Sequence, residues 1–151
     1  MSIEMKRYYY SYSQFLKDVK SLGSLLENRD FSAIIAVARG GLTISHFLSN
    51  LLNIRSVYSI NSISYSGTTK LEDIHIFGLP HLQDEKSILV VDDISDSGKT
   101  LTKVVENLQH LYPDTNFHTL TIFYKSTSSF QPNYYIHKIE DTWIDFFWGT
   151  D

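Results

Sequence analysis

Short apolar runs along this chain alternate with longer stretches in which apolar residues recur at helical spacing. The runs Ala33–Ala38 and Ile88–Val91 are apolar throughout, which is typical of strands buried on both faces in a helix-covered parallel sheet. Each run is followed by a polar turn and then by a helical pattern, over residues 42–52 and about 100–111. These strand–turn–helix units predict an α/β fold with a mostly parallel twisted sheet flanked by helices.

The remaining patterns add one helix and several strands. Ser13 is a predicted N-cap for a helix from Gln14 to about Asn28, whose apolar residues recur on one face. The tyrosine-rich segment 8–12 precedes this helix and is interpreted as edge packing or a subunit contact. No internal repeat or linker interrupts the chain, so residues 1–151 are predicted to form a single domain. Further β-rich segments predict strands over residues 54–63, 74–80, 119–124 and 134–136.

Composition narrows the class of protein. With 151 residues, of which 42% are hydrophobic, the chain can bury a sizeable core in one domain. A net charge of −4 without a basic arm argues against general nucleic-acid binding. The chain has no cysteine, which excludes a disulfide framework and a thiolate zinc site. No apolar run approaches the ~20 residues that cross a bilayer, and no signal peptide is evident, so we expect a cytoplasmic protein.

Candidate chemistry is concentrated between residues 87 and 100. Asp92 and Asp93 directly follow an apolar run, and neighbouring strand residues point to opposite faces, so both reach one site only if the strand ends there. Asp96 adds a third carboxylate before the turn Ser97–Thr100, which opens the next helix. Backbone amides at such a turn suit a phosphate. The carboxylates repel phosphate, so they need a diol, a metal ion or a proton to act on.

This segment resembles the phosphoribosyl pyrophosphate (PRPP) binding motif of the type I phosphoribosyltransferases. That motif is an apolar strand, two acidic residues, two variable residues and Asp-Thr-Gly-x-Thr; here Ser97 stands in place of the first threonine. The resemblance implies that family's fold, with a small hood beside the sheet. It also implies a Mg²⁺-dependent pentosyl transferase (a glycosyltransferase) of purine salvage, assembled as a homodimer or homotetramer.

The resemblance assigns PRPP-binding roles residue by residue. It implies that Asp92 and Asp93 accept the ribose hydroxyls and hold Mg²⁺, and that Asp96 is the catalytic residue that positions the base and relays its proton. The ribose phosphate would lie on four residues of the following turn: Ser97, Gly98, Lys99 and Thr100. The family's pyrophosphate loop corresponds to a second turn: Arg39, Gly40 and Gly41. Taken alone, that second pattern favours a helix start with a surface arginine, and the acidic motif beside it shifts the interpretation to a binding loop.

Two lysines receive roles from the same resemblance. The polar segment 64–74 stands where the family has a mobile loop, and its Lys70 would meet pyrophosphate; an ordinary hairpin loop is the alternative. Lys125 follows a predicted strand and resembles a family lysine that hydrogen-bonds the exocyclic oxygen of the purine. Without the resemblance, a lysine at the end of a strand is usually solvated.

The C-terminal segment Asp141-Thr142-Trp143-Ile144 is similar to the hood of the bacterial xanthine-guanine phosphoribosyltransferases. It implies that Trp143 stacks on the purine and that the Ile144 carbonyl reads its exocyclic group. The hood would be formed mainly by residues 126–151. Without the resemblance, an aromatic-rich C-terminus most often covers a core edge or an interface.

These roles favour a 6-oxopurine (guanine, xanthine or hypoxanthine) as the acceptor, because Lys125 is a donor and adenine presents another donor there. Two alternatives stay open: a phosphoribosyltransferase for another base such as orotate, and a non-catalytic PRPP-sensing regulator of the same fold. The sequence Ser-Gly-Lys-Thr at 97–100 imitates the end of a P-loop. The P-loop pattern requires a glycine five positions before Gly98, where this chain has Asp93, so that reading is rejected.

Overall fold

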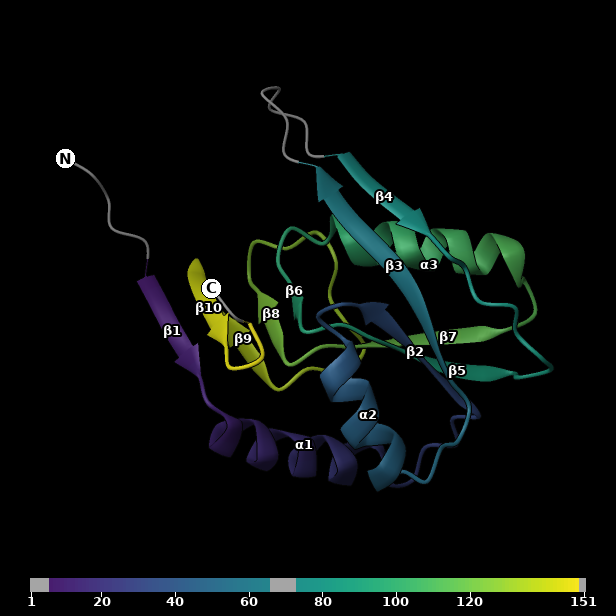
Figure 1. The fold of residues 1–151 in the computed structure, drawn as a ribbon, viewed down its shortest axis with the longest axis horizontal. Helices are drawn as coiled ribbons and strands as arrows, with labels where there is room; N and C mark the ends of the chain where they lie inside the picture. Colours follow the sequence, from purple (N-terminus) through teal and green to yellow (C-terminus); the bar gives the residue numbers. More distant parts are fainter. Residues whose placement is uncertain (1–5, 66–72, 150–151) are drawn as a thin grey trace.

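A five-stranded sheet forms the centre of the computed structural model, which describes residues 6–65 and 73–149. The strand order is β4-β3-β2-β5-β7; all neighbours run parallel except β3 and β4. The strands are β2 (Ala33–Ala38), β3 (Val57–Tyr65), β4 (Asp73–Phe77), β5 (Ser87–Val91) and β7 (Asn116–Leu120). The predicted mostly parallel sheet is confirmed (Figure 1).

Helices cover both faces of this sheet, which explains why its central strands are apolar throughout. On one face, Ile34 and Leu89 pack in the same core as residues of α1 (Tyr12–Leu26) and α2 (Leu42–Leu51). On the other face, Ile35 and Val90 share a second core with α3 (Lys99–Leu111). Figure 1 shows α3 on one side of the sheet and α1 with α2 on the other. Among the described helices, none is long and apolar enough to cross a membrane.

Helix α1 begins two residues earlier than predicted. Ser11 is extended and its Oγ accepts a hydrogen bond from the Gln14 amide at 3.1 Å, so Ser11 and not Ser13 is the N-cap. The helix ends at Leu26 instead of near Asn28. The prediction failed locally because two serines flank Tyr12, and the sequence does not show which has the extended backbone.

The predicted strand 119–124 is two strands in two sheets. β7 ends at Leu120, and β8 (Phe123–Lys125) joins β6 (Ile94–Ser95) and β9 (His137–Ile139) in a small parallel sheet of order β6-β8-β9. Between them, the amide of Ile122 donates to the Asp93 carbonyl, which draws the chain away from the large sheet. The strand predicted at 134–136 is also displaced, because Tyr134 forms only an isolated bridge to Leu120.

The two ends of the described chain pair with each other, which the sequence did not predict. β1 (Lys6–Tyr10) runs parallel to β10 (Thr142–Phe146), from Lys6 opposite Thr142 to Tyr10 opposite Phe146. Figure 1 shows this two-stranded ribbon beside the small sheet. Tyr10 is fully buried among aromatic rings, whereas Tyr9 is exposed, so edge packing describes only part of the tyrosine segment.

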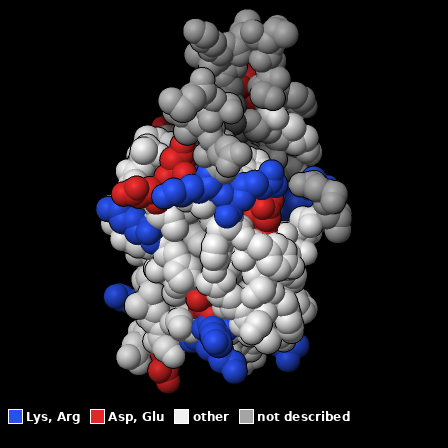
Figure 2. All heavy atoms as spheres, turned by 90° about the vertical axis from the view of Figure 1, so that its left-hand side faces the viewer, with Lys and Arg blue, Asp and Glu red and all other residues white. Residues whose placement is uncertain are grey.

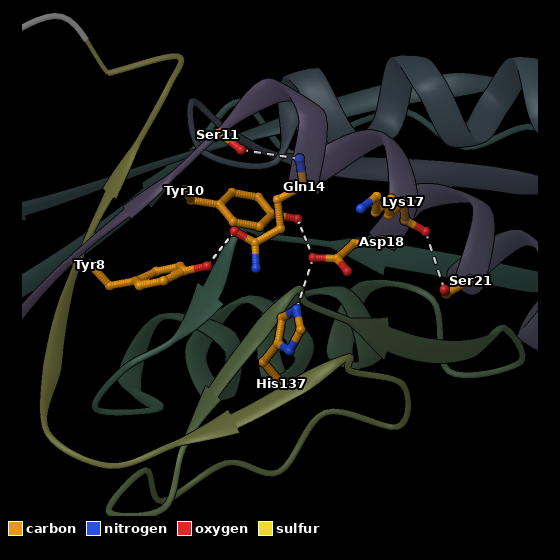
Figure 3. Close-up of polar contacts among 8 residues, drawn as sticks. All are labelled: Tyr8, Tyr10, Ser11, Gln14, Lys17, Asp18, Ser21 and His137. Carbon is orange, nitrogen blue, oxygen red and sulfur yellow. Dashed lines mark hydrogen bonds and ion pairs between the residues drawn. The ribbon is translucent and has the colours of Figure 1, made fainter.

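A buried carboxylate fastens the ribbon to α1 and β9. Asp18 Oδ2 accepts a hydrogen bond from the Tyr10 hydroxyl at 2.6 Å and lies 2.8 Å from His137 Nε2 (Figure 3). Burial, with Asp18 nearby, raises the pKa of Tyr10 far above its ordinary value, so the hydroxyl remains a donor. The cluster therefore joins β1 and α1, which are consecutive in the chain, to β9, which lies more than a hundred residues later.

Candidate active site

An acidic pocket lies where β5 ends. The strand stops at Val91, and both Asp92 and Asp93 follow it directly into the same cavity of about 330 Å³. The Asp92 amide donates to the Leu120 carbonyl, so the chain stays attached to the edge of the sheet as it turns. The cavity is lined by Asp92, Asp93, Ile94, Ser95, Asp96, Ser97, Gly98, Thr100 and Leu101. Six of these lining residues received roles from the resemblance: Asp92, Asp93, Asp96, Ser97, Gly98 and Thr100. Lys99, which also received one, does not line the cavity.

The two neighbouring carboxylates of this pocket are costly to ionise in the free protein. Burial, together with the charge of Asp93, raises the pKa of Asp92 well above its ordinary value, and burial raises the pKa of Asp93 as well. Each carboxylate accepts one backbone hydrogen bond of 2.8 Å, from the amides of Asp93 and Ile94 respectively. The pocket therefore favours a cation or hydroxyl donors beside these two acids.

The donor set fits a metal ion held largely by substrate. Mg²⁺ prefers oxygen ligands and binds through one or two carboxylates together with phosphate oxygens. Asp92 and Asp93 supply such carboxylates at adjacent positions. Among the described residues, no group of three or more His, Cys, Asp or Glu side chains could hold a metal ion alone. The protein thus offers an incomplete shell of the kind that a phosphorylated ligand completes.

The turn after β2 packs directly against the acidic turn. A Cβ atom on Gly40 would lie 2.5 Å from Asp93 Cγ, and one on Gly41 would lie 2.1 Å from the Val91 carbonyl oxygen. At Gly41 the neighbour is backbone, so only glycine fits there, whereas at Gly40 a larger residue would require the Asp93 side chain to shift. The Gly41 amide donates to the Val37 carbonyl at 2.8 Å, so it is engaged within the turn. Arg39, joined to Ala38 by a cis peptide bond, is exposed beside these glycines.

The start of α3 packs closely against the loop that follows β8. Gly98, the N-cap of α3, has a φ of +89°, and a Cβ atom there would lie 2.6 Å from the Phe130 nitrogen. The amide and hydroxyl of Ser129 both donate to the Ser97 carbonyl at 2.9 Å. The loop after β8 therefore supports the turn that begins α3, a role for Ser129 that carried no signal in the sequence. Lys99, the first residue of the helix, is exposed.

Lys125 lies between two carboxylates at the end of β8. Its side chain is only 9% exposed, and its Nζ lies 2.9 Å from Asp96 Oδ1 and 3.6 Å from Asp141 Oδ1. The lysine expected to read the purine is thus paired with the acid expected to handle the proton. Asp141 was not singled out from the sequence, although it opens the Asp-Thr-Trp-Ile segment. Its contact with Lys125 joins the C-terminal segment to the acidic turn.

The structure does not bring every candidate residue into the acidic pocket. Trp143 lies on β10 with 47% of its surface exposed, and its indole nitrogen donates to Asp145 Oδ1 at 3.1 Å. Ile144 is buried in the core shared with α1 and α2. Neither residue lines the pocket at the end of β5. Lys70 falls outside the described residues.

Comparisons with known proteins identify the family of this chain. The sequence is 33% identical to the xanthine-guanine phosphoribosyltransferase of Roseobacter denitrificans, over 95% of this chain and 85% of that protein. The structure matches the Helicobacter pylori xanthine-guanine-hypoxanthine phosphoribosyltransferase with a TM-score of 0.86 and 39% identity, covering 94% of this chain and 93% of that one. It also matches a purine phosphoribosyltransferase from Pyrococcus horikoshii with a TM-score of 0.85 and 31% identity, over 97% of each chain. The phosphoribosyl transferase domain model matches residues 11–151, and the chain belongs to the phosphoribosyltransferase family.

Proposed function

We propose that this phosphoribosyltransferase transfers ribose 5-phosphate from PRPP to a ring nitrogen of a 6-oxopurine, giving a nucleoside monophosphate and pyrophosphate. The observation that carries the proposal is the near-buried Lys125 paired with Asp96 at the edge of the acidic pocket. A donor and an acceptor side by side match the oxo group and the ring nitrogens of such a base. The names of the relatives from Roseobacter denitrificans and Helicobacter pylori support the same substrate class.

The acidic pocket is suited to the sugar of PRPP. Breaking the bond to pyrophosphate leaves positive charge on the sugar carbon, as in glycoside hydrolysis. Asp92 and Asp93 would accept the two ribose hydroxyls and stabilise that charge. The ribose phosphate would lie against the turn formed by Ser97, Gly98, Lys99 and Thr100, at the N-terminus of α3.

Pyrophosphate would leave along the glycine turn that packs on Asp93. Arg39 offers bidentate donors to phosphate oxygens, and Gly40 permits a close backbone approach. The amide of Gly41 is engaged with Val37, so we assign Gly41 to the packing of the turn. Mg²⁺, held by Asp92, Asp93 and the substrate, would supply charge neutralisation for the leaving group. Lys70 would complete the pyrophosphate site.

The base would be held between the acidic turn and the C-terminal segment. Lys125 would donate to the exocyclic oxygen, which disfavours adenine, and Asp96 would orient the base and accept its proton. Trp143 would stack on the ring, and the Ile144 carbonyl would read its exocyclic group. We assign residues 126–151 to a hood within a single domain of residues 1–151. Assembly as a homodimer or homotetramer in the cytoplasm completes the proposal.

Pyrophosphate release tests the function directly. The protein would be incubated with PRPP and Mg²⁺ and, in parallel, with guanine, xanthine, hypoxanthine, adenine or orotate, with a control lacking any base. We expect release with one or more 6-oxopurines and none with adenine. Release with orotate alone would identify a pyrimidine enzyme. PRPP binding without release from any base would identify a PRPP-sensing regulator instead.

A further inference from the structure

An exposed tryptophan on β10 is held by a carboxylate that an arginine from the other end of the chain fixes. The Trp143 indole donates from Nε1 to Asp145 Oδ1 at 3.1 Å. Arg7 binds the same carboxylate in two places, from Nε to Oδ2 at 3.1 Å and from Nη2 to Oδ1 at 2.8 Å. Oδ1 therefore accepts from both the indole and the guanidinium. We name these three residues, Arg7, Trp143 and Asp145, the indole clamp.

The strand register places the indole clamp on one face of the ribbon. Arg7 is opposite Trp143 and Tyr9 is opposite Asp145, and side chains two residues apart share a face. Ile144, on the other face, is only 8% exposed, whereas Trp143 is 47% exposed. The Trp143 ring is thus held in place without filling the hydrophobic core. Figure 2 views the molecule from the ribbon side, where acidic and basic side chains lie next to one another.

Stability alone gives little reason for this arrangement. The Arg7 side chain is 66% exposed and that of Asp145 is 32% exposed, and exposed ion pairs contribute little to folding. The hydrogen bonds from Arg7 lower the pKa of Asp145, so the carboxylate remains a charged acceptor near neutral pH. A charged acceptor with two arginine contacts restricts the indole to one orientation. What the clamp provides is therefore orientation of an exposed flat ring.

We propose that Asp145 and Arg7 are positioning residues, which hold the Trp143 indole as a preset stacking surface for the base. The inference rests on the proposed function, which places the purine against Trp143. A ring that is already oriented loses less conformational freedom when the base binds. If the ring were released, only the fraction of molecules with the correct rotamer would bind, and the apparent affinity for the base would fall by that fraction.

Steady-state kinetics separate this role from a structural one. Asp145→Ala should raise KM for the purine about 3-fold, since one of about three χ1 rotamers stays competent. kcat and KM for PRPP should change little. Asp145→Asn retains an acceptor for the indole and should have a smaller effect. Asp84→Ala is the matched control, because it removes a carboxylate from another exposed ion pair, with Lys86, and should leave KM unchanged.

A double-mutant cycle shows whether Asp145 acts through the indole. Trp143→Phe removes the indole N–H but keeps an aromatic ring. In that background, Asp145→Ala should add no further increase in KM for the base. The same fold increase in both backgrounds would overturn the proposal, and so would an unchanged KM for Asp145→Ala in an enzyme that is active with purines.

A measurement without catalysis keeps this proposal separate from the proposed function. The chain has two tryptophans, so Trp148→Phe leaves Trp143 as the single tryptophan fluorophore. Adding Asp145→Ala should then speed the fluorescence depolarisation of the indole and increase its quenching by acrylamide. Unchanged depolarisation would overturn the clamp. If no base supports pyrophosphate release, the proposed function fails, while this measurement still decides whether Asp145 holds the ring.

Discussion

Lys125 is the residue through which the acidic turn and the C-terminal segment meet. Its Nζ lies 2.9 Å from Asp96 Oδ1 and 3.6 Å from Asp141 Oδ1, and its side chain is nine-tenths buried. A nearly buried cation requires a compensating anion. Asp96 therefore balances the charge of Lys125 in addition to facing the pocket, and a change at Asp96 should affect the chemistry more than the binding of PRPP.

We expect Asp96→Asn to lower kcat by about 100-fold or more, the usual contribution of a positioned general acid or base. Asparagine keeps the size and one acceptor oxygen but cannot take a proton at neutral pH. KM for PRPP should change little, because Asp92 and Asp93 are intact. Asp141→Asn is the control, since it removes the more distant partner of Lys125 and should cost less activity. Wild-type kcat in Asp96→Asn would remove the role assigned to this residue.

Gly41 provides a steric test of the contact between the two turns. In Gly41→Ala the new Cβ would lie 2.1 Å from the Val91 carbonyl oxygen, which is backbone and cannot rotate away. We expect a loss of about 1–3 kcal/mol of stability, as for other overpacked sites, together with a large loss of activity. Gly149→Ala, whose Cβ would meet its nearest atom at 3.3 Å, should be far milder in the same melting and activity assays. Equal melting temperatures for both variants would contradict the packing argument.

Part of the candidate site could be predicted from the sequence, namely the features that depend on a local pattern of residues. The features that depend on tertiary geometry could not be predicted. The end of β5 could be predicted because an apolar run stops at two carboxylates, and both do line one pocket. The ion pair between Lys125 and Asp96 could not be predicted, because it depends on how the chain leaves the large sheet after β7 to form β8 in the small sheet. The engagement of the Gly41 amide with Val37 likewise depends on backbone geometry that glycine does not specify.

At the scale of elements, the pairing of β1 with β10 is the feature that the sequence did not predict. Consecutive tyrosines hide the alternation of a strand, and the partner of β1 lies at the far end of the chain. The ribbon nevertheless has the alternation of a strand, because every second side chain faces the protein: Tyr8 and Tyr10 on β1, and Ile144 on β10. The helices and central strands were predicted more closely because their patterns are local, as in β2, whose bounds match the prediction.

Tyr10→Phe tests how the ribbon is fastened to α1 and β9. The change keeps the aromatic packing but removes a buried donor to Asp18, which should cost about 1–3 kcal/mol. For a chain of this size, each kcal/mol lowers the melting temperature by roughly 2–4 °C. Tyr8→Phe is the matched control, because its hydroxyl binds Gln14 at an exposed position and should matter little. A Tyr10→Phe protein that melts with the wild type would show that the buried hydrogen bond is energetically neutral.

At the scale of the whole molecule, the site lies where parallel strands end, as is usual for such sheets. The turns after β2 and β5 meet there, and Asp92 and Asp93 line a cavity at that edge. The pKa values of Asp92 and Asp93 at this edge are raised by burial. The folded state therefore holds their protons more tightly than the unfolded chain does. The contribution of these two carboxylates to the stability of the free protein should therefore fall as pH rises above the unfolded pKa of about 3.9.

Asp92→Asn tests two effects of this carboxylate separately: the destabilisation of the free protein and the proposed binding of Mg²⁺ and the ribose. Asparagine keeps the acceptor for the Asp93 amide but carries no charge, so the free variant should melt above the wild type at neutral pH. The difference should shrink below about pH 4, where the carboxylate is protonated in both states. With Mg²⁺ and PRPP at about 100 times Kd, the wild type should gain about 2.7 kcal/mol, or roughly 5–10 °C. The variant should gain much less, because it lacks a carboxylate for the metal and the ribose. Thermal melts with PRPP, with and without Mg²⁺, would measure both effects; a variant that melts lower alone and gains the full shift would contradict the assignment of Asp92.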